Sequence, residues 1–178
     1  MMKFGVKNAE QTQDTNKSKK TLREKIWALA SHVLMAVLIA VIVFNLVFFI
    51  SHVPTGSMIP TISEDARIVV QKIFVNYDYE DIVVFYSDEF DAYLVKRLIG
   101  KPGDKITITE NEIFRNGEKL EEKYLVEDYV YEMAEFEIPD NCYFFLGDNR
   151  DESIDAREWD NPYISKDKLL GEVAFIFN

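Results

Sequence analysis

The stretch IWALASHVLMAVLIAVIVFNLVFFI, residues 26–50, decides how the chain is organised. It is predominantly apolar, and no Asp, Glu, Lys or Arg occurs from Ile26 through Ser63. A helix needs about 20 such residues to cross the hydrocarbon core of a bilayer. The sequence therefore predicts a transmembrane anchor helix over residues 26–50, which separates a short N-terminal segment from a longer C-terminal part.

Two other interpretations of this stretch are a buried helix of a soluble protein and a cleaved signal peptide. A signal peptide has an apolar core of only about 7 to 15 residues, followed by a cleavage site of small residues. Here the apolar run is longer, and VPTGSM, residues 53–58, follows it. An uncleaved anchor is therefore the prediction.

The segment before the anchor is basic. Residues 1–25 hold seven Lys and Arg against three Asp and Glu. By the positive-inside rule, this charge excess places residues 1–25 in the cytoplasm as a basic tail, and residues 51–178 outside the membrane. Residues 6–20, rich in Lys, Gln, Asn, Thr and Asp, have the composition of a disordered tail.

The remainder of the chain is acidic, with 13 Lys and Arg against 28 Asp and Glu after residue 25. This balance argues against nucleic acid as a main partner, because neutralising phosphates requires clustered positive charge. The single cysteine, Cys142, excludes an intrachain disulfide. No His/Cys cluster has the spacing of metal ligands, so neither a metal nor an organic cofactor is predicted.

Beyond Thr61 the sequence changes to short β-type runs separated by turn residues. The runs are RIVVQKI (67–73), DIVVFY (81–86), AYLVKRLI (92–99), KITIT (105–109), NEIF (111–114), CYFFL (142–146) and GEVAFIF (171–177). Asn116-Gly117 is a strong two-residue hairpin signal. Few long helical periods occur, so we expect a mainly β protein: an antiparallel β-sheet domain over residues 51–178, preceded by one transmembrane helix. The acidic stretch near 118–137 is either a small insertion or a solvated loop.

The segment VPTGSMIPT, Val53 to Thr61, has two prolines and a glycine around Ser57 and indicates a stiff, defined path. A serine nucleophile needs an adjacent base to take its proton. His32 lies inside the predicted membrane segment, and His52 lies five residues upstream in an extended run. A Ser-His-Asp triad is therefore disfavoured, and a serine enzyme here would need a lysine.

Lys96 is the best candidate for that lysine. If residues 92–99 form a strand, alternation places Lys96 on the same face as Leu94 and Leu98. Desolvation among hydrocarbon lowers the pKa of an ammonium group, as a general base near pH 7 requires. The alternative is a lysine whose stem packs while its amine reaches water or a carboxylate. This segment alone leaves both interpretations open.

Three motifs occur in order after the anchor: PTGSMIPT (54–61), YLVKRLIGKPGD (93–104) and GDNRDESIDAR (147–157). Together they resemble the type I signal peptidases, membrane-bound serine proteases with a Ser-Lys dyad, in their single-anchor form. The resemblance implies that Ser57 is the nucleophile and that Lys96 is the general base, which later protonates the leaving amine. It also implies an oxyanion hole formed by the backbone N–H of Ser57 and the hydroxyl of Thr55.

The resemblance further implies that Ser153 orients the lysine amine by a hydrogen bond. Five charged residues match those that brace the family's site by salt bridges: Arg97, Asp148, Arg150, Asp155 and Arg157. Taken without the family, GDNRDESIDAR is simply a charged turn. The sequence departs from the family pattern at Ala156, where serine is common, and at Glu80, where glycine often stands.

The family removes signal peptides from exported preproteins, cleaving after small residues at the first and third positions before the bond, commonly Ala-x-Ala. The resemblance implies the same substrates here, a bilayer around the anchor and secretion machinery nearby. It implies no cofactor. Val53, Met58 and Val95 flank the dyad and are candidates for the substrate pocket.

Two competing hypotheses remain open. A Ser-Lys peptidase of another kind, such as a self-cleaving repressor, would need a DNA-binding or partner-binding N-terminus in place of the apolar segment. A membrane-tethered β domain that only binds partners would leave the combination of Ser57, Lys96 and Ser153 unexplained.

Overall fold

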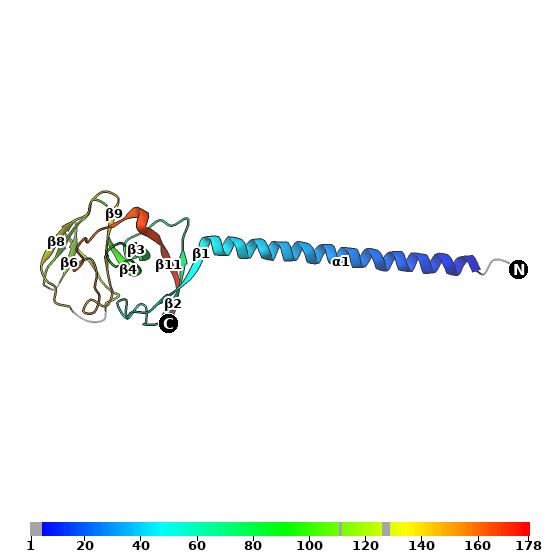
Figure 1. Cartoon of the computed structure of the whole chain (residues 1–178), viewed down its shortest axis with the longest axis horizontal. Coiled ribbons are helices and arrows are strands. Elements are labelled where there is room, and N and C mark those ends of the chain that lie inside the picture. Colours follow the sequence, from blue (N-terminus) through cyan, green and yellow to red (C-terminus); the bar gives the residue numbers. More distant parts are fainter. Residues whose placement is uncertain (1–4, 111, 126–128) are drawn as a thin grey trace. The chain divides into compact units, whose positions relative to one another are not determined.

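The structure is a computed structural model that describes residues 5–110, 112–125 and 129–178, with side chains described from Thr21 on. The chain divides into two compact units, one up to Leu46 and one from Val47 to Asn178. Figure 1 shows the first unit as a single helix and the second as a β-rich body.

The first unit is helix α1, Gly5–Val47. Its part Thr21–Val47 is long and apolar enough to cross a membrane, so the predicted N-terminal apolar helix is confirmed. Three polar side chains within it bond to the helix's own carbonyls: His32 Nδ1 pairs with the oxygen of Ala28 at 2.5 Å, Ser31 Oγ donates to the same oxygen at 2.8 Å, and Asn45 Nδ2 donates to Val41 at 2.8 Å. Such internal pairing is what a polar group in hydrocarbon requires.

The helix also includes residues 6–20, where composition predicted a disordered tail. This segment contains neither proline nor glycine between Val6 and Lys20. Nucleation is the costly step of helix formation, whereas each residue added to an existing helix gains a hydrogen bond. A long apolar helix can therefore extend into such a segment. The composition of residues 6–20 does not take account of the helix that follows them, so it did not predict this extension.

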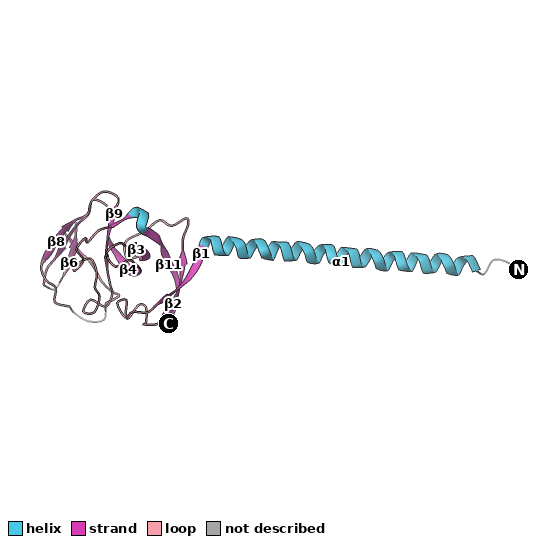
Figure 2. Cartoon of the chain, viewed as in Figure 1, coloured by secondary structure: helices cyan, strands magenta, loops and turns pink. Residues whose placement is uncertain are grey.

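The second unit is built from two antiparallel sheets (Figure 2). The larger one has seven strands in the order β1-β2-β11-β3-β4-β9-β10. Its strands are β1 Phe48–Val53, β2 Ala66–Gln71, β3 Ile82–Ser87, β4 Ala92–Gly100, β9 Cys142–Leu146, β10 Ile164–Ser165 and β11 Leu169–Phe177. The smaller sheet has the order β7-β6-β5-β8, with β5 Lys105–Ile108, β6 Ile113–Arg115, β7 Glu118–Lys119 and β8 Ala134–Glu137. A short 3-10 helix, η1 Lys166–Lys168, precedes β11. The predicted mainly β fold is confirmed.

Each of the seven predicted β-type runs coincides with a strand. The hairpin signal is also confirmed: Asn116 and Gly117 join β6 to β7 with φ angles of 54° and 85°. Positive φ at both central residues is the geometry that a tight hairpin turn of this type requires. Residue 111, in the run NEIF, lies outside the described residues.

Strand β1 is one of the elements that the sequence did not reveal, with β8 and β10. Helix α1 ends at Val47, and residues 48–50, which the sequence placed in the anchor, pair instead with β2. The register runs from Phe48 opposite Gln71 to Val53 opposite Ala66. β1 is thus an edge strand of the large sheet, and it delivers the chain directly to Pro54.

The acidic stretch 118–137 contributes β7 and β8 to the ends of the small sheet. Between those strands, Tyr131 is buried and Tyr124 is partly buried against the main hydrophobic cluster. Residues 126–128 lie outside the described residues. The acidic stretch therefore includes side chains that pack on the core and that also contact residues of the candidate site.

The hydrophobic core forms two clusters. One gathers around Phe85, Phe144 and Phe145, and its Phe85 and Phe145 rings stack with centroids 4.5 Å apart. The other includes Met58 and Ile62, which are fully buried. Burying one such side chain stabilises the fold by about 1.5–3 kcal/mol. The second cluster therefore fastens the segment that carries Ser57.

Candidate active site

The segment from Val53 to Thr61 is held at both ends. Val53 closes β1 and is buried, and Met58 is buried directly after Ser57. Two backbone bonds shape the turn between them: Ile59 N donates to Gly56 O at 3.1 Å and Ile62 N to Met58 O at 2.8 Å. Ser57 itself is only half-buried. Its hydroxyl therefore stands on a fixed backbone at an accessible position.

Lys96 lies on the interior strand β4, opposite Val83 of β3, and is only 4% exposed. Its Nζ donates a hydrogen bond to Ser153 Oγ at 2.9 Å. Burial lowers the pKa of Lys96 to about 8, against a smaller opposing effect of the Asp155 carboxylate. With this pKa about a tenth of the amine is uncharged at pH 7, far more than for an ordinary lysine, and this neutral form can accept a proton.

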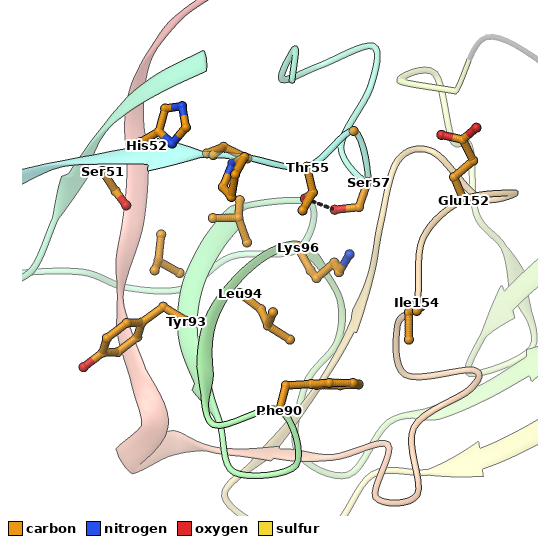
Figure 3. Close-up of a pocket in the computed structure, with 15 residues that line it drawn as sticks. Ser51, His52, Thr55, Ser57, Phe90, Tyr93, Leu94, Lys96, Glu152 and Ile154 are labelled. Carbon is orange, nitrogen blue, oxygen red and sulfur yellow. Dashed lines mark hydrogen bonds between the residues drawn. The ribbon is translucent and has the colours of Figure 1, made fainter. Parts of the chain in front are cut away.

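Ser57, Thr55 and Lys96 line one pocket (Figure 3). Thr55 Oγ1 and Ser57 Oγ lie 3.4 Å apart. Among the described residues no hydrogen bond joins the side chains of Ser57 and Lys96, and in substrate-free enzymes catalytic hydrogen bonds are often long. The pocket thus brings together a nucleophile candidate, a base candidate and a second hydroxyl.

The turn that follows β9 carries Ser153 to the lysine. Ser153 is buried, and Gly147 packs tightly between it and the nucleophile segment. A Cβ on residue 147 would lie 2.1 Å from Ser153 Oγ and 2.6 Å from the backbone oxygen of Ser57. Real Cβ atoms do not approach so closely, so only glycine fits at this position.

Asn149 joins this turn to the nucleophile segment, a contact that sequence reasoning missed. Its backbone N–H donates to Ser57 O at 3.1 Å. Its side-chain Nδ2 donates to Gly56 O at 3.0 Å and to Glu152 Oε2 at 3.1 Å. The one available signal was an uncharged amide within the charged motif GDNR. An amide can donate hydrogen bonds to backbone carbonyls without bringing a charge to the site.

Asp148 and Arg97 form a buried two-point ion pair. Arg97 Nε donates to Asp148 Oδ1 at 2.8 Å, and the second carboxylate oxygen receives a bond of 2.5 Å from the same guanidinium. Thr61 Oγ1 donates to that second oxygen at 2.5 Å, and Arg97 also donates to the carbonyl of Glu80 at 2.7 Å. These bonds tie the end of the nucleophile segment to β4. Thr61 is another partner that the sequence did not reveal.

Asp155 and Arg157 hold the turn from the other side. Asp155 is fully buried and accepts a hydrogen bond from Gly147 N at 2.9 Å. Arg157 Nε donates to Asp155 Oδ1 at 2.8 Å. The same guanidinium donates to the carbonyls of Arg150 at 2.8 Å and Ser153 at 3.4 Å. The backbone around Ser153 is therefore fixed by a charged pair.

Arg150 reaches a different partner, from the acidic stretch. Its side chain is almost fully buried and donates to both carboxylate oxygens of Glu122, and to the hydroxyl of Tyr131 at 2.7 Å. Its Nε donates to Gly147 O at 2.9 Å. Sequence reasoning placed Arg150 near the site but missed Glu122, because that residue lies in a run of surface-type charges.

The two departures from the family pattern have clear local settings. Glu80 has a φ of 73°, in the left-handed region that favours glycine. Ala156 is buried in the main hydrophobic cluster, and its N–H donates to Phe145 O at 3.3 Å. Neither side chain contributes to the pocket that holds Ser57 and Lys96.

The remaining wall of the pocket is largely apolar. Val53 and Val95 line it, as do Val84 and Leu94, whereas Met58 lies in the core beneath the segment. Two strand edges border the pocket. β1 is an edge strand, and in the described residues the pairing of β4 with β9 begins only at Arg97. The first half of β4 therefore has a free edge.

Comparison with known proteins places these features in context. A family described as "Signal peptidase, peptidase S26" matches residues 26–178. The chain is 32% identical over 176 residues to a probable signal peptidase I-2 of Synechocystis, covering 92% of this chain and 78% of that one. It is 32% identical over 173 residues to signal peptidase I S of Bacillus subtilis, covering 89% and 90%. A crystal structure of a signal peptidase I from Enterococcus faecalis superposes with a TM-score of 0.50 at 25% identity, covering 56% of this chain and 98% of that one.

Proposed function

Because the chain belongs to the signal peptidase family, peptidase S26, and is a serine peptidase that removes signal peptides, we propose that Ser57 and Lys96 carry out the cleavage. The observation that carries this proposal is the shared pocket. In it, a half-buried serine hydroxyl faces the same space as a buried amine whose pKa is lowered to about 8. An amine of that pKa is suited to take a proton from a hydroxyl near neutral pH.

In the proposed reaction the neutral Lys96 amine removes the proton from Ser57 Oγ as the oxygen attacks the scissile carbonyl carbon. The resulting ammonium protonates the leaving amine when the C–N bond breaks. A water molecule, deprotonated by the same amine, then hydrolyses the acyl-enzyme. Ser153 keeps the amine in place through its 2.9 Å hydrogen bond.

The negative oxygen of the tetrahedral intermediate needs fixed donors. We assign this role to the backbone N–H of Ser57 and the hydroxyl of Thr55, whose Oγ1 lies 3.4 Å from Ser57 Oγ. A donor placed where charge develops typically contributes about 3 kcal/mol to lowering the barrier. Thr55→Ala is expected to lower kcat more than it changes KM.

The strand edges beside the pocket support recognition of an extended peptide. A peptide can add to the free edges of β1 and of the first half of β4, which border the pocket. Alternate side chains of such a peptide would point at the apolar wall that includes Val53 and Val95. Shallow apolar pockets accept small residues, which supports cleavage after an Ala-x-Ala pattern. Met58 supports this wall from the core.

We also propose the cellular arrangement. The apolar segment, which begins at Ile26 and ends with helix α1 at Val47, anchors the chain in the cell membrane as a single span. The basic residues 1–25 are cytoplasmic, and the catalytic domain, which begins with β1 at Phe48, is extracytoplasmic, where signal peptides emerge from the secretion machinery. The charge asymmetry across the segment supports this orientation.

The test is cleavage of a preprotein with an Ala-x-Ala site by the full chain in detergent, across a pH series. Wild type should gain activity through about pH 8, and Lys96→Ala and Ser57→Ala should be inactive although folded. Lys105→Ala, at an exposed position, is the matched control and should retain activity. Inert but folded wild type on several such substrates would overturn the proposal, and full activity of either dyad variant would remove that residue from it.

A further inference from the structure

The pocket beside Ser57 carries one carboxylate among its described lining residues, that of Glu152. Glu152 is exposed, and in the described part of the chain no salt bridge neutralises it. Three other ionisable side chains line the pocket: Lys96, which is buried and uncharged in its reactive form, His52, whose Nε2 lies 3.1 Å from Asp65 Oδ1, and Tyr93. An incoming peptide therefore meets an unpaired negative charge next to the reacting atoms.

Glu152 is held in a defined position. Its Oε2 accepts a hydrogen bond of 3.1 Å from Asn149 Nδ2, the same amide that bonds to Gly56 O. The carboxylate oxygen lies 3.9 Å from the point where a Cβ on Gly56 would stand, directly before the nucleophile. The charge is thus fixed beside the nucleophile segment and does not depend on a freely moving side chain.

The location of Glu152 indicates which part of a substrate it meets. In Figure 3, Glu152 and Ile154 lie on the opposite side of Ser57 from Ser51, His52 and Tyr93. The free strand edges belong to β1 and the start of β4, which carry the latter residues. Residues before the scissile bond must stay bound until the acyl-enzyme is hydrolysed, so they occupy those edges. The chain after the bond then leaves past Glu152.

We propose that Glu152 is a specificity-determining residue that favours a basic side chain, and disfavours an acidic one, at the first or second position after the scissile bond. This inference rests on the proposed function and adds an electrostatic preference on the leaving side. The mechanism is direct charge interaction across a partly solvated cleft. Such interactions are modest and screened by salt.

The experiment compares peptides that share one Ala-x-Ala site and differ only by Lys, Gln or Glu at the first position after the bond, or at the second. The full chain in detergent is assayed as wild type, Glu152→Gln and Glu152→Lys. Glutamine keeps an oxygen acceptor for Asn149 while removing the charge. We expect wild type to cleave a Lys peptide with kcat/KM about two- to fivefold above its Glu counterpart, with the preference absent in Glu152→Gln and reversed in Glu152→Lys.

The matched control is Asp151→Asn, which removes the neighbouring exposed carboxylate that does not line the pocket. It should keep the wild-type preference, and raising the salt concentration should reduce that preference. Equal kcat/KM ratios in wild type and Glu152→Gln at both positions would overturn the inference while leaving the proposed function intact. If wild type cleaves none of the peptides, the proposed function itself fails, and the inference fails with it.

Discussion

Lys96 Nζ donates a 2.9 Å hydrogen bond to Ser153 Oγ, and both side chains are almost fully buried. The two residues come from β4 and from the turn after β9, 57 positions apart in sequence. Burial lowers the pKa of the amine, while the hydroxyl fixes where its nitrogen stands. The reactivity and the position of the amine therefore have separate structural causes, and each can be tested separately.

The position of the Lys96 amine is tested by Ser153→Ala. Without the hydroxyl the amine keeps its apolar surroundings but loses its orientation, and a displacement of about 1 Å can cost about 100-fold in rate. We expect a large fall in kcat with little change in KM, and partial recovery in Ser153→Thr. Steady-state kinetics on one preprotein measure both. Ser165→Ala, on β10, should behave as wild type; an equal loss of kcat there would point to a general effect.

The lowered pKa of Lys96 can be tested by measuring how the stability of the protein depends on pH. The pKa of Lys96 is lowered from 10.5 to about 8 in the folded protein, so between these pH values the unfolded chain binds more protons. Stability should therefore rise with pH from about 8 to about 10.5 because of this group. Lys96→Met should abolish that rise and increase the free energy of unfolding at pH 7 by up to about 3 kcal/mol.

Thermal unfolding of the full chain in detergent, recorded as a pH series, checks this expectation. Lys105→Met removes an exposed lysine and should leave the pH dependence unchanged. A Lys96→Met profile parallel to that of wild type would contradict the assignment of the titration to Lys96.

The close packing at Gly147 predicts a steric effect. In Gly147→Ala the new methyl group would overlap Ser153 Oγ and the backbone oxygen of Ser57. Overpacking of this kind costs about 1–3 kcal/mol, and we expect activity to fall at least 100-fold as the dyad is displaced. Gly103→Ala meets no atom within 4 Å but has a φ of 85°. That control should lose stability through backbone strain while keeping kcat.

The acidic stretch should support the site through Glu122. Removing its charge leaves the buried Arg150 guanidinium without a counter-ion, and breaking a buried pair in this way costs about 3 kcal/mol or more. Glu122→Gln is expected to lower the unfolding midpoint in denaturant clearly. Glu121→Gln, at an exposed ion pair with Lys123, should cause no measurable change. Equal midpoints for the two variants would show that the Arg150 pair is dispensable.

Glu80 offers a stabilising substitution. Its φ of 73° is strained for a residue with a Cβ, so Glu80→Gly should raise the free energy of unfolding by about 0.5–1 kcal/mol. The same substitution at Glu64, whose φ is not positive, should destabilise, because glycine increases the freedom of the unfolded chain. Chemical denaturation distinguishes the two outcomes. A loss of stability in Glu80→Gly would show that the carboxylate side chain contributes more than the backbone strain costs.

Most of the strands could be predicted because β-branched and aromatic residues cluster between turn residues, as in DIVVFY and CYFFL. Strand β1 could not, because its first residues, Phe48 to Ile50, continue the apolar composition of the helix before them. The strands β8 and β10 are short and partly polar, and they exist only through their pairing with β5 and β9. The residue composition of these short segments does not indicate which strands they pair with.

The site divides in the same way. Ser57 and Lys96 could be proposed because they are residue types that the chemistry requires, and Ser153 because its motif resembles that of the type I signal peptidases. Thr61, Glu122 and Asn149 act through contacts with partners 28 to 93 positions away. Which surface-type residues meet across such separations depends on the folded sheets, so a single sequence does not reveal them.

Consecutive residues of β4 serve opposite sides of the sheet: Lys96 reaches Ser153, and Arg97 reaches Asp148. A slip of one position in strand pairing would exchange them and bring a guanidinium, which keeps its proton at any physiological pH, into the place of the amine. A chain paired in that register would have no neutral amine beside Ser57, and we expect it to be inactive.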